Sequence, residues 1–276
     1  MPPTRRRSDR DRAVASSDWR PRLASAVGPV TWVRPLGGGA WRVDAGGRAL
    51  VAKAGPGAPD EAEGLRRLAA VEGGPPVPTV VHADGQLLVT TMVDQAARTP
   101  EHEESLGRDL ARLHGAASAH WGGGSAWIGA CPLDPAPHGD GATFYGARLS
   151  ELAARCGLAG PIRGVVDRLP ALLPPGGPSL LHGDLWWGNV LFGADGRSWL
   201  IDPSVHGGHP EEDLAMLALF GRVPERALAA YQEVRPLPAG WPERVALFQL
   251  YPLLVHAVLF GGAYLSQAEA IARRFG

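Results

Sequence analysis

The run His182-Gly-Asp-Leu-Trp-Trp-Gly-Asn189 decides how this chain is interpreted, together with Ile201-Asp-Pro203, whose aspartate follows thirteen residues after the asparagine. These segments supply a carboxylate at Asp184, an amide at Asn189 and a second carboxylate at Asp202. A carboxylate can accept the proton of a hydroxyl group, and hard oxygen ligands suit Mg²⁺. An isolated H-G-D sequence is common by chance, and buried aspartates often cap turns, but the full spacing is far rarer.

The residues between Asn189 and Asp202 predict a short hairpin. Residues 190–192 are apolar, Ala194-Asp-Gly196 is a turn signal, and residues 198–201 return as a second strand. Such a hairpin places Asp202 beside the first segment.

The spacing of these side chains is typical of phosphoryl transfer. The protein-kinase catalytic loop has the pattern H-R-D, four further residues and N, followed by a metal-binding aspartate. We therefore expect Asp184 to act as the catalytic base and Asn189 and Asp202 to bind Mg²⁺, with ATP as the phosphate donor.

Lys53 is the only lysine among 27 basic residues. A lysine kept where arginine is used everywhere else indicates a task for a compact point charge. It ends the apolar run Ala49-Leu-Val-Ala52, which resembles the V-A-I-K strand whose lysine holds the ATP phosphates. The alternative is that one lysine survived by accident.

Residues 30–53 are expected to form strands around Gly37, Gly38 and Gly39, a turn whose backbone can approach phosphates. There is no G-x-x-x-x-G-K-[ST] pattern, so this is not a Walker loop.

Residues 60–71 predict an amphipathic helix that begins with two acids, Glu61 and Glu63. One of them could pair with Lys53, and we favour Glu61. Both could also be ordinary solvated acids at a helix start.

Strands are then expected at residues 79–82 and 86–92, followed by helices and by a long loop at residues 122–141. Thr91, Met92 and Val93 form the expected hinge whose backbone meets adenine. Early strands and late helices indicate an α+β fold with two lobes and a nucleotide cleft between them. The expected organisation is a disordered tail at 1–18, an ATP-binding lobe at 19–93 and a catalytic and substrate-binding lobe at 94–276.

Composition excludes several classes. The net charge of −1 gives no bulk attraction to nucleic acid or membrane. The apolar residues 247–265 include Pro252, His256 and two glycines, which favours a buried helix and a turn over a membrane span. Two cysteines without a metal pattern, and the absence of a signal peptide, favour the cytoplasm. The arginines of residues 5–12 could form a nucleic-acid arm but are more typical of a tail.

With these motifs in view, residues 20–275 resemble the fructosamine kinase (ketosamine-3-kinase) family, a branch of the protein-kinase-like fold related to aminoglycoside phosphotransferases. The resemblance is carried by the tryptophan after H-G-D-L and by the following runs: Leu200-Ile-Asp-Pro-Ser204, His209-Pro-Glu-Glu-Asp-Leu-Ala-Met216, Leu219-Phe-Gly221, Leu250-Tyr-Pro-Leu-Leu-Val-His256 and Phe260-Gly-Gly-Ala-Tyr264.

The resemblance implies transfer of the ATP γ-phosphate to the 3-hydroxyl of a ketosamine, a sugar joined to an amine by glycation, so that the labile product sheds the sugar. It implies a phosphate-positioning pair of Lys53 and Glu61, and a sugar-stacking role for Trp186. Trp187 occupies a position that varies within the family, so we expect it to pack against neighbouring side chains.

The chain departs from the family pattern at several positions. Ala40 stands near the glycine turn, where some members have a cysteine that forms a disulfide dimer, so a monomer is expected. Thr91 replaces an acidic hinge residue, and Asp134 stands where asparagine is usual. The alternatives are another small-molecule kinase, acting on an aminoglycoside or choline, and a catalytically dead ATP-binding module.

Overall fold

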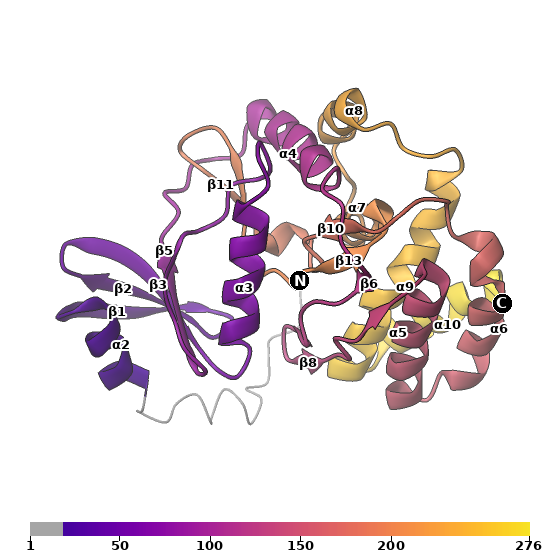
Figure 1. Cartoon of the computed structure of the whole chain (residues 1–276), viewed down its shortest axis with the longest axis horizontal. Helices are drawn as coiled ribbons and strands as arrows, with labels where there is room; N and C mark the ends of the chain where they lie inside the picture. Colours follow the sequence, from indigo (N-terminus) through magenta and orange to yellow (C-terminus); the bar gives the residue numbers. More distant parts are fainter. Residues whose placement is uncertain (1–18) are drawn as a thin grey trace.

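The computed structural model describes residues 19–276, so the expected tail at 1–18 and its arginines lie outside the described part. Figure 1 shows a smaller part built around a sheet and a larger part built mainly of helices. The predicted α+β architecture with two lobes is confirmed. β5 ends at Thr91, and the chain crosses from one lobe to the other in residues 92–99.

The sheet of the smaller lobe is antiparallel and five-stranded, with the strand order β1-β2-β3-β5-β4. One helix precedes the sheet and a second connects β3 to β4. The elements of this lobe are α2 (Trp19–Val27), β1 (Val30–Gly37), β2 (Ala40–Ala45), β3 (Arg48–Ala54), α3 (Ala58–Ala69), β4 (Val80–Ala83) and β5 (Leu87–Thr91).

The alternation of side chains along β3 decides which residues face the cleft. Leu50 and Ala52 are buried in a cluster with Leu23 of α2, on one face of the sheet. Because successive side chains of a strand point to opposite faces, Lys53 points to the other face, towards α3. Burying Leu50 and Ala52 therefore fixes the direction of the lysine.

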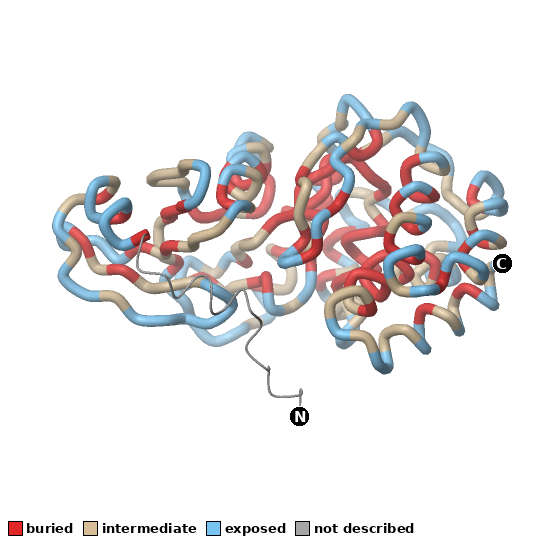
Figure 2. Tube along the Cα trace, turned by 90° about the horizontal axis from the view of Figure 1, so that it is seen from below, coloured by how far each residue is buried: buried red, intermediate tan, exposed pale blue. Residues whose placement is uncertain are grey.

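The larger lobe is packed around α9, which contributes nine buried residues. In Figure 2 the buried stretches of the trace gather in the interior of this lobe. Its helices are α4 (Pro100–Leu113), α5 (Gly141–Cys156), α6 (Ala159–Leu172), the 3₁₀ helix η1 (Trp187–Asn189), α7 (Pro210–Leu217), α8 (Glu225–Val234), α9 (Trp241–Phe260) and α10 (Ala263–Phe275).

By length and composition alone, α9 could cross a membrane. It is a core helix instead, because half of its apolar window is buried against neighbouring helices of the same lobe. The break before α10 falls at Gly261 and Gly262, both at positive φ.

Two small sheets position the catalytic segments. One has the order β10-β13-β6-β9 and the other is the predicted hairpin β11-β12. Their strands are β6 (Trp121–Gly122), β9 (Pro137–His138), β10 (Ser179–Leu181), β11 (Val190–Phe192), β12 (Ser198–Leu200) and β13 (His206–Gly208). Of these strands, the sequence predicted only the hairpin.

The segment expected as a loop at 122–141 contains a tiny hairpin of β7 (Trp127–Ile128) and β8 (Cys131–Pro132). This segment also joins the lobes, because the Ala126 N–H donates to Asp60 Oδ2 of α3 at 3.0 Å. The crossing itself is bound to the β11-β12 hairpin, because the N–H groups of Ala96 and Ala194 donate to the carbonyls of Phe192 and Asp94, both at 2.8 Å.

Candidate active site

Strand pairing brings together the two segments that carry the predicted site residues, namely residues 182–189, called the catalytic segment below, and residues 201–203. β10 pairs with β13 in a register that places Leu181 opposite His206, so the residues after β10 run beside those before β13. The Ser204 N–H donates to the His182 carbonyl at 2.9 Å. Gly183 between them has φ +79°, and a Cβ there would collide with the Ser204 carbonyl oxygen, so only glycine fits.

The buried carboxylate of Asp213 holds the backbone just before Asp184. The N–H groups of His182 and Gly183 donate to its two oxygens at 2.8 and 2.9 Å. His114 Nε2 lies 3.1 Å from Asp213 Oδ2. Burial alone would raise the pKa of Asp213, but the contact with His114 and the backbone N–H groups hold it below its usual value. Asp213 is therefore an ionised anchor for the catalytic segment.

Asp184 and Asn189 are joined directly. Asn189 Nδ2 donates to the Asp184 carbonyl at 2.8 Å and to its Oδ2 at 3.2 Å. Burial raises the pKa of Asp184 to about 7, and the Asp202 carboxylate adds to this rise while the Asn189 amide opposes it. A carboxylate with such a pKa is poised to exchange a proton near neutral pH.

Lys53 joins the two lobes. Its Nζ donates to Glu61 Oε1 of α3 at 2.7 Å and forms an ion pair with Asp202. Burial alone would lower the pKa of Lys53, but the Glu61 and Asp202 carboxylates outweigh it and hold it above its usual value. Glu63, the other candidate partner, is exposed and lies 4.0 Å from Arg66 instead.

Asp202 has a strained backbone, because its φ of +57° is the only positive value at a non-glycine among residues 19–276. Aspartate tolerates this left-handed conformation better than most residues, at a cost of about 1–3 kcal/mol. Such strain clusters at functional sites. The conformation directs Asp202 to Lys53 immediately after the hairpin.

The predicted nucleotide-binding backbone falls in two places. Gly37, Gly38 and Gly39 form the exposed turn between β1 and β2, with φ of +98°, +61° and +84°. The register pairs Ala40, the next residue, with Lys53, so the turn lies beside the lysine.

The three hinge residues differ in their backbone bonds. The Thr91 N–H donates to Thr79 at 2.9 Å and the Met92 N–H to Ala49 at 3.3 Å. In the described part of the chain, Val93 is the one of the three whose N–H makes no such bond. Val93 is therefore the hinge residue best placed to donate to a base.

The donor set fits Mg²⁺. Because Asn189 uses its Nδ2 towards Asp184, its amide oxygen is the atom left to ligate a cation, and Asp202 supplies a carboxylate. No group of three or more His, Cys, Asp or Glu residues that could hold a metal occurs in residues 19–276. Mg²⁺ in kinase sites needs no such cage, since it binds one or two protein ligands together with phosphate oxygens and water.

The two tryptophans of the catalytic segment differ in surroundings. Trp186 is 39% exposed, and its ring meets Phe220 edge-on with centroids 6.1 Å apart. The Arg98 guanidinium stacks over the Trp187 ring, with its central carbon 4.5 Å from the ring centroid. This contact agrees with the expectation that Trp187 packs against neighbouring side chains.

Sequence reasoning missed the anchoring role of Asp213. In the sequence, the run Pro210-Glu-Glu-Asp213 stands out only as part of the family pattern. All three acids are buried, and Arg244 pairs with Glu211 at 2.6 Å. A signal was present, since three consecutive acids inside an otherwise apolar helix must find buried partners.

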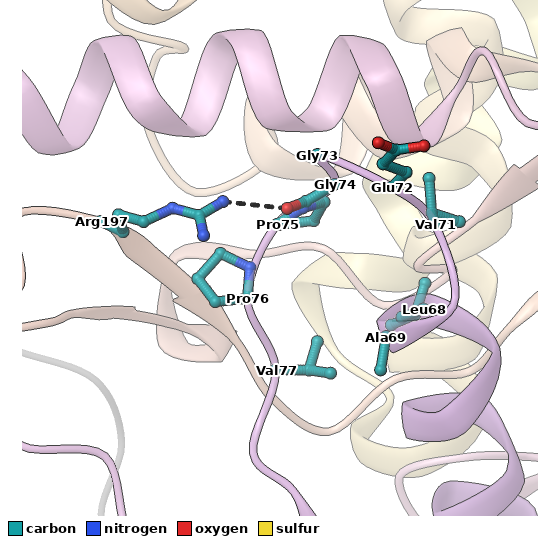
Figure 3. A pocket seen from close by; sticks show the side chains of 10 residues that line it. All are labelled: Leu68, Ala69, Val71, Glu72, Gly73, Gly74, Pro75, Pro76, Val77 and Arg197. Atoms are coloured by element: carbon teal, nitrogen blue, oxygen red, sulfur yellow. Dashed lines mark hydrogen bonds between the residues drawn. The ribbon is translucent and has the colours of Figure 1, made fainter.

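A hollow of about 350 Å³ lies away from this site, between the end of α3 and the β11-β12 hairpin. Figure 3 shows Arg197 reaching across it to the Gly74 carbonyl, a hydrogen bond of 3.0 Å. No sequence-predicted site residue lines it.

Comparisons with known proteins agree with this geometry. The family model for fructosamine kinase matches residues 58–275. A probable ketoamine kinase of Thermus thermophilus is 36% identical over 211 residues, which cover 74% of this chain and 77% of that protein. A probable ketoamine kinase of Enterococcus faecium is 46% identical over 98 residues, and the match spans only about a third of either protein, 36% and 35%.

Solved structures extend the likeness to the whole fold. A crystal structure from Thermobifida fusca, assigned as a fructosamine-3-kinase, has a TM-score of 0.84 at 37% identity and covers 93% of this chain and 97% of that one. The complex of APH(2'')-IIa with gentamicin has a TM-score of 0.66 at 15% identity, with 94% and 98% covered, which shows a shared fold alone. With the matching model spanning most of its length, this chain belongs to the fructosamine kinase family, a family of ATP-dependent phosphotransferases.

Proposed function

We propose that this protein transfers the γ-phosphate of ATP to the 3-hydroxyl of a ketosamine. The observation that carries the proposal is the convergence of Asp184, Asn189, Asp202 and Lys53 on one cleft between the lobes. Membership of the fructosamine kinase family supports the acceptor class.

In this proposal Asp184 orients the acceptor hydroxyl and takes its proton. The hydroxyl oxygen then forms a bond to the γ-phosphorus, while the bond from the γ-phosphorus to the bridging oxygen breaks and ADP leaves. A pKa of about 7 lets Asp184 accept this proton and release it to solvent afterwards.

The remaining residues hold the donor. Lys53, fixed by Glu61, contacts the phosphates, and the glycine turn at residues 37–39 covers them. Asn189 and Asp202 would hold Mg²⁺, which when bound offsets the charge of the phosphate oxygens. The Val93 N–H donates a hydrogen bond to the edge of the adenine ring. Trp186 lies against the C–H face of the sugar.

The experiment is an ATP-consumption screen across N-alkyl ribulosamines, erythrulosamines and fructosamines, with aminoglycosides and choline as competing acceptors. Wild type should consume ATP with at least one ketosamine, and Asp184→Asn should lose this activity while still binding nucleotide. Turnover only with an aminoglycoside or choline would refute the acceptor class. No turnover with any acceptor would favour an ATP-binding module instead.

We place the activity in the cytoplasm, because Cys131 and Cys156 are both free thiols. We also propose that the protein is a monomer, since no cysteine stands at the glycine turn to form a disulfide between two copies. Sedimentation of the purified protein in the presence and absence of reductant tests this.

A further inference from the structure

Five aromatic side chains form a continuous cluster beside the catalytic segment, and the proposed function uses only one of them. They come from the catalytic segment, the residues after α7, the end of α9 and the start of α10. We call this set the aromatic cluster: Trp186, Phe220, His256, Phe260 and Tyr264.

The rings of the aromatic cluster meet mostly edge-on or tilted rather than stacked. Phe220 lies 5.3 Å from His256 and 6.5 Å from Tyr264 between ring centroids, and His256 lies 5.7 Å from Phe260. Phe220 is 47% exposed and Phe260 is 62% exposed. Large apolar side chains gathered at a surface in this way mark a binding site more often than a packing defect.

The cluster begins two residues after the catalytic base in the sequence. The backbone N–H of Trp186 donates to the backbone carbonyl of Asp184 at 3.2 Å, and the Trp186 ring lies over Gly188 within the same catalytic segment. From Trp186 the rings lead through Phe220 to the end of α9. An acceptor whose hydroxyl lies at Asp184 therefore has its remaining atoms beside aromatic faces.

The cluster contains no cation of its own. Among residues 19–276, no arginine or lysine stacks on any of the five rings, although Arg98, Arg42 and Arg148 stack on aromatic rings elsewhere. The His256 Nδ1–H donates to the Pro252 carbonyl at 2.6 Å, which leaves Nε2 as an acceptor in the neutral ring. Burial lowers the pKa of His256, so the ring is neutral at pH 7.

We propose that the aromatic cluster is the subsite for the cationic amine of the acceptor, held by cation–π contacts with the rings and by a hydrogen bond to His256 Nε2. The inference rests on the proposed function and adds the part of the substrate that the cluster selects. Phe220, Phe260, His256 and Tyr264 are then specificity-determining residues.

The chemistry of a ketosamine fits this arrangement. Its nitrogen is attached to C1 and its reactive hydroxyl to C3, so three carbons, C1 to C3, lie between the nitrogen and the hydroxyl oxygen. An alkylammonium group is cationic at pH 7, and aromatic faces attract such cations. A free ketose carries the same hydroxyl without the cation, and the cluster distinguishes the two.

The experiment compares two acceptors that differ only in charge. One is 1-deoxy-1-(propylamino)ribulose, and the other is the propyl ether in which oxygen replaces the amine; the fructose pair is assayed in parallel. The variants are Phe220→Leu and Phe260→Leu, which keep apolar volume and remove the π face. Trp32→Leu, an exposed aromatic of β1 in the other lobe, is the matched control. Melting curves and size-exclusion profiles accompany the kinetics.

Wild type should prefer the amine by about tenfold or more in kcat/KM. Each leucine variant should lower kcat/KM for the amine about fivefold, with the ether and the KM for ATP changed less than twofold. Trp32→Leu should change neither acceptor.

Equal losses on amine and ether would overturn the inference, because the cluster would then supply only apolar contact. The same holds if the variants change the oligomeric state together with both activities, since the cluster would be an interface between copies. A wild type that phosphorylates amine and ether equally well refutes the inference but keeps the proposed function. A wild type that phosphorylates no acceptor of either pair refutes both.

Discussion

Replacing Asp213 by asparagine tests the anchor of the catalytic segment. The carboxylate is buried and accepts the N–H groups of His182 and Gly183 while it contacts His114. An asparagine of the same shape keeps one acceptor oxygen, but its NH₂ group faces one of the former donors. Asp213→Asn therefore leaves at least one buried donor without a partner.

The expected magnitude follows from that donor. A buried hydrogen-bonding group left unsatisfied costs about 1–3 kcal/mol, and bonds to a charged acceptor are at the upper end. A loss of about 2 kcal/mol corresponds to a fall in Tm of about 4–8 °C for a chain of this size. Because His182 and Gly183 directly precede Asp184, kcat should fall about tenfold or more, since a small misplacement of the base is costly.

The assay combines urea denaturation with steady-state kinetics on the strongest acceptor of the screen. Asp195→Asn is the matched control, because Asp195 also accepts hydrogen bonds from Arg197 and Trp199 but does so at an exposed hairpin turn. The control should change the free energy of unfolding by less than about 0.5 kcal/mol. If Asp213→Asn matches wild type in both measurements, the anchoring argument is wrong.

Four further predictions address the site and its surroundings. Asp184→Asn should lower turnover by about 10²-fold or more and leave nucleotide binding intact, as measured by nucleotide titration; near-normal turnover would remove its role as base. Asp202→Ala should abolish activity at every Mg²⁺ concentration, whereas full wild-type activity in excess chelator would contradict the metal site. Trp186→Ala should raise the acceptor KM far more than the ATP KM, and a lower Tm with both KM values changed alike would indicate packing between lobes. Burial lowers the pKa of His182 and His209, so below about pH 6.5 the unfolded chain binds protons there that the folded chain does not, whereas Asp184, whose pKa is raised to about 7, binds its proton first in the folded chain; between pH 7.5 and 5.5 the free energy of unfolding should therefore fall more in Asp184→Asn than in wild type, and equal changes in the two urea midpoints would count against this.

The sequence was most informative where the chemistry is local. The spacing from Asp184 to Asn189 and the hairpin to Asp202 involve neighbouring residues, so turn signals and alternation were sufficient to predict them. Lys53 was recognisable because it is a solitary lysine at the end of a strand. Its partner Glu61 required the direction of α3, which the sequence left open between two acids.

Contacts between distant segments could not be predicted in this way. The anchor of Asp213 joins residues about thirty positions apart, and the aromatic cluster joins four separate elements. The strands β10 and β13 are each three residues long, which is too short for an alternating pattern of apolar and polar residues to be recognised. Tertiary packing decides these features, and no local pattern specifies them.

The contacts of α3 with the larger lobe determine what stays assembled between turnovers. The Ala126 N–H donates to Asp60 near the start of α3, while beyond its end the Leu200 N–H donates to the Pro76 carbonyl and Arg197 donates to the Gly74 carbonyl. Glu61 is the neighbour of Asp60, so it stands on a helix that these contacts hold against the larger lobe. The Lys53–Glu61 pair therefore forms without nucleotide, and each turnover can begin with both residues already in place.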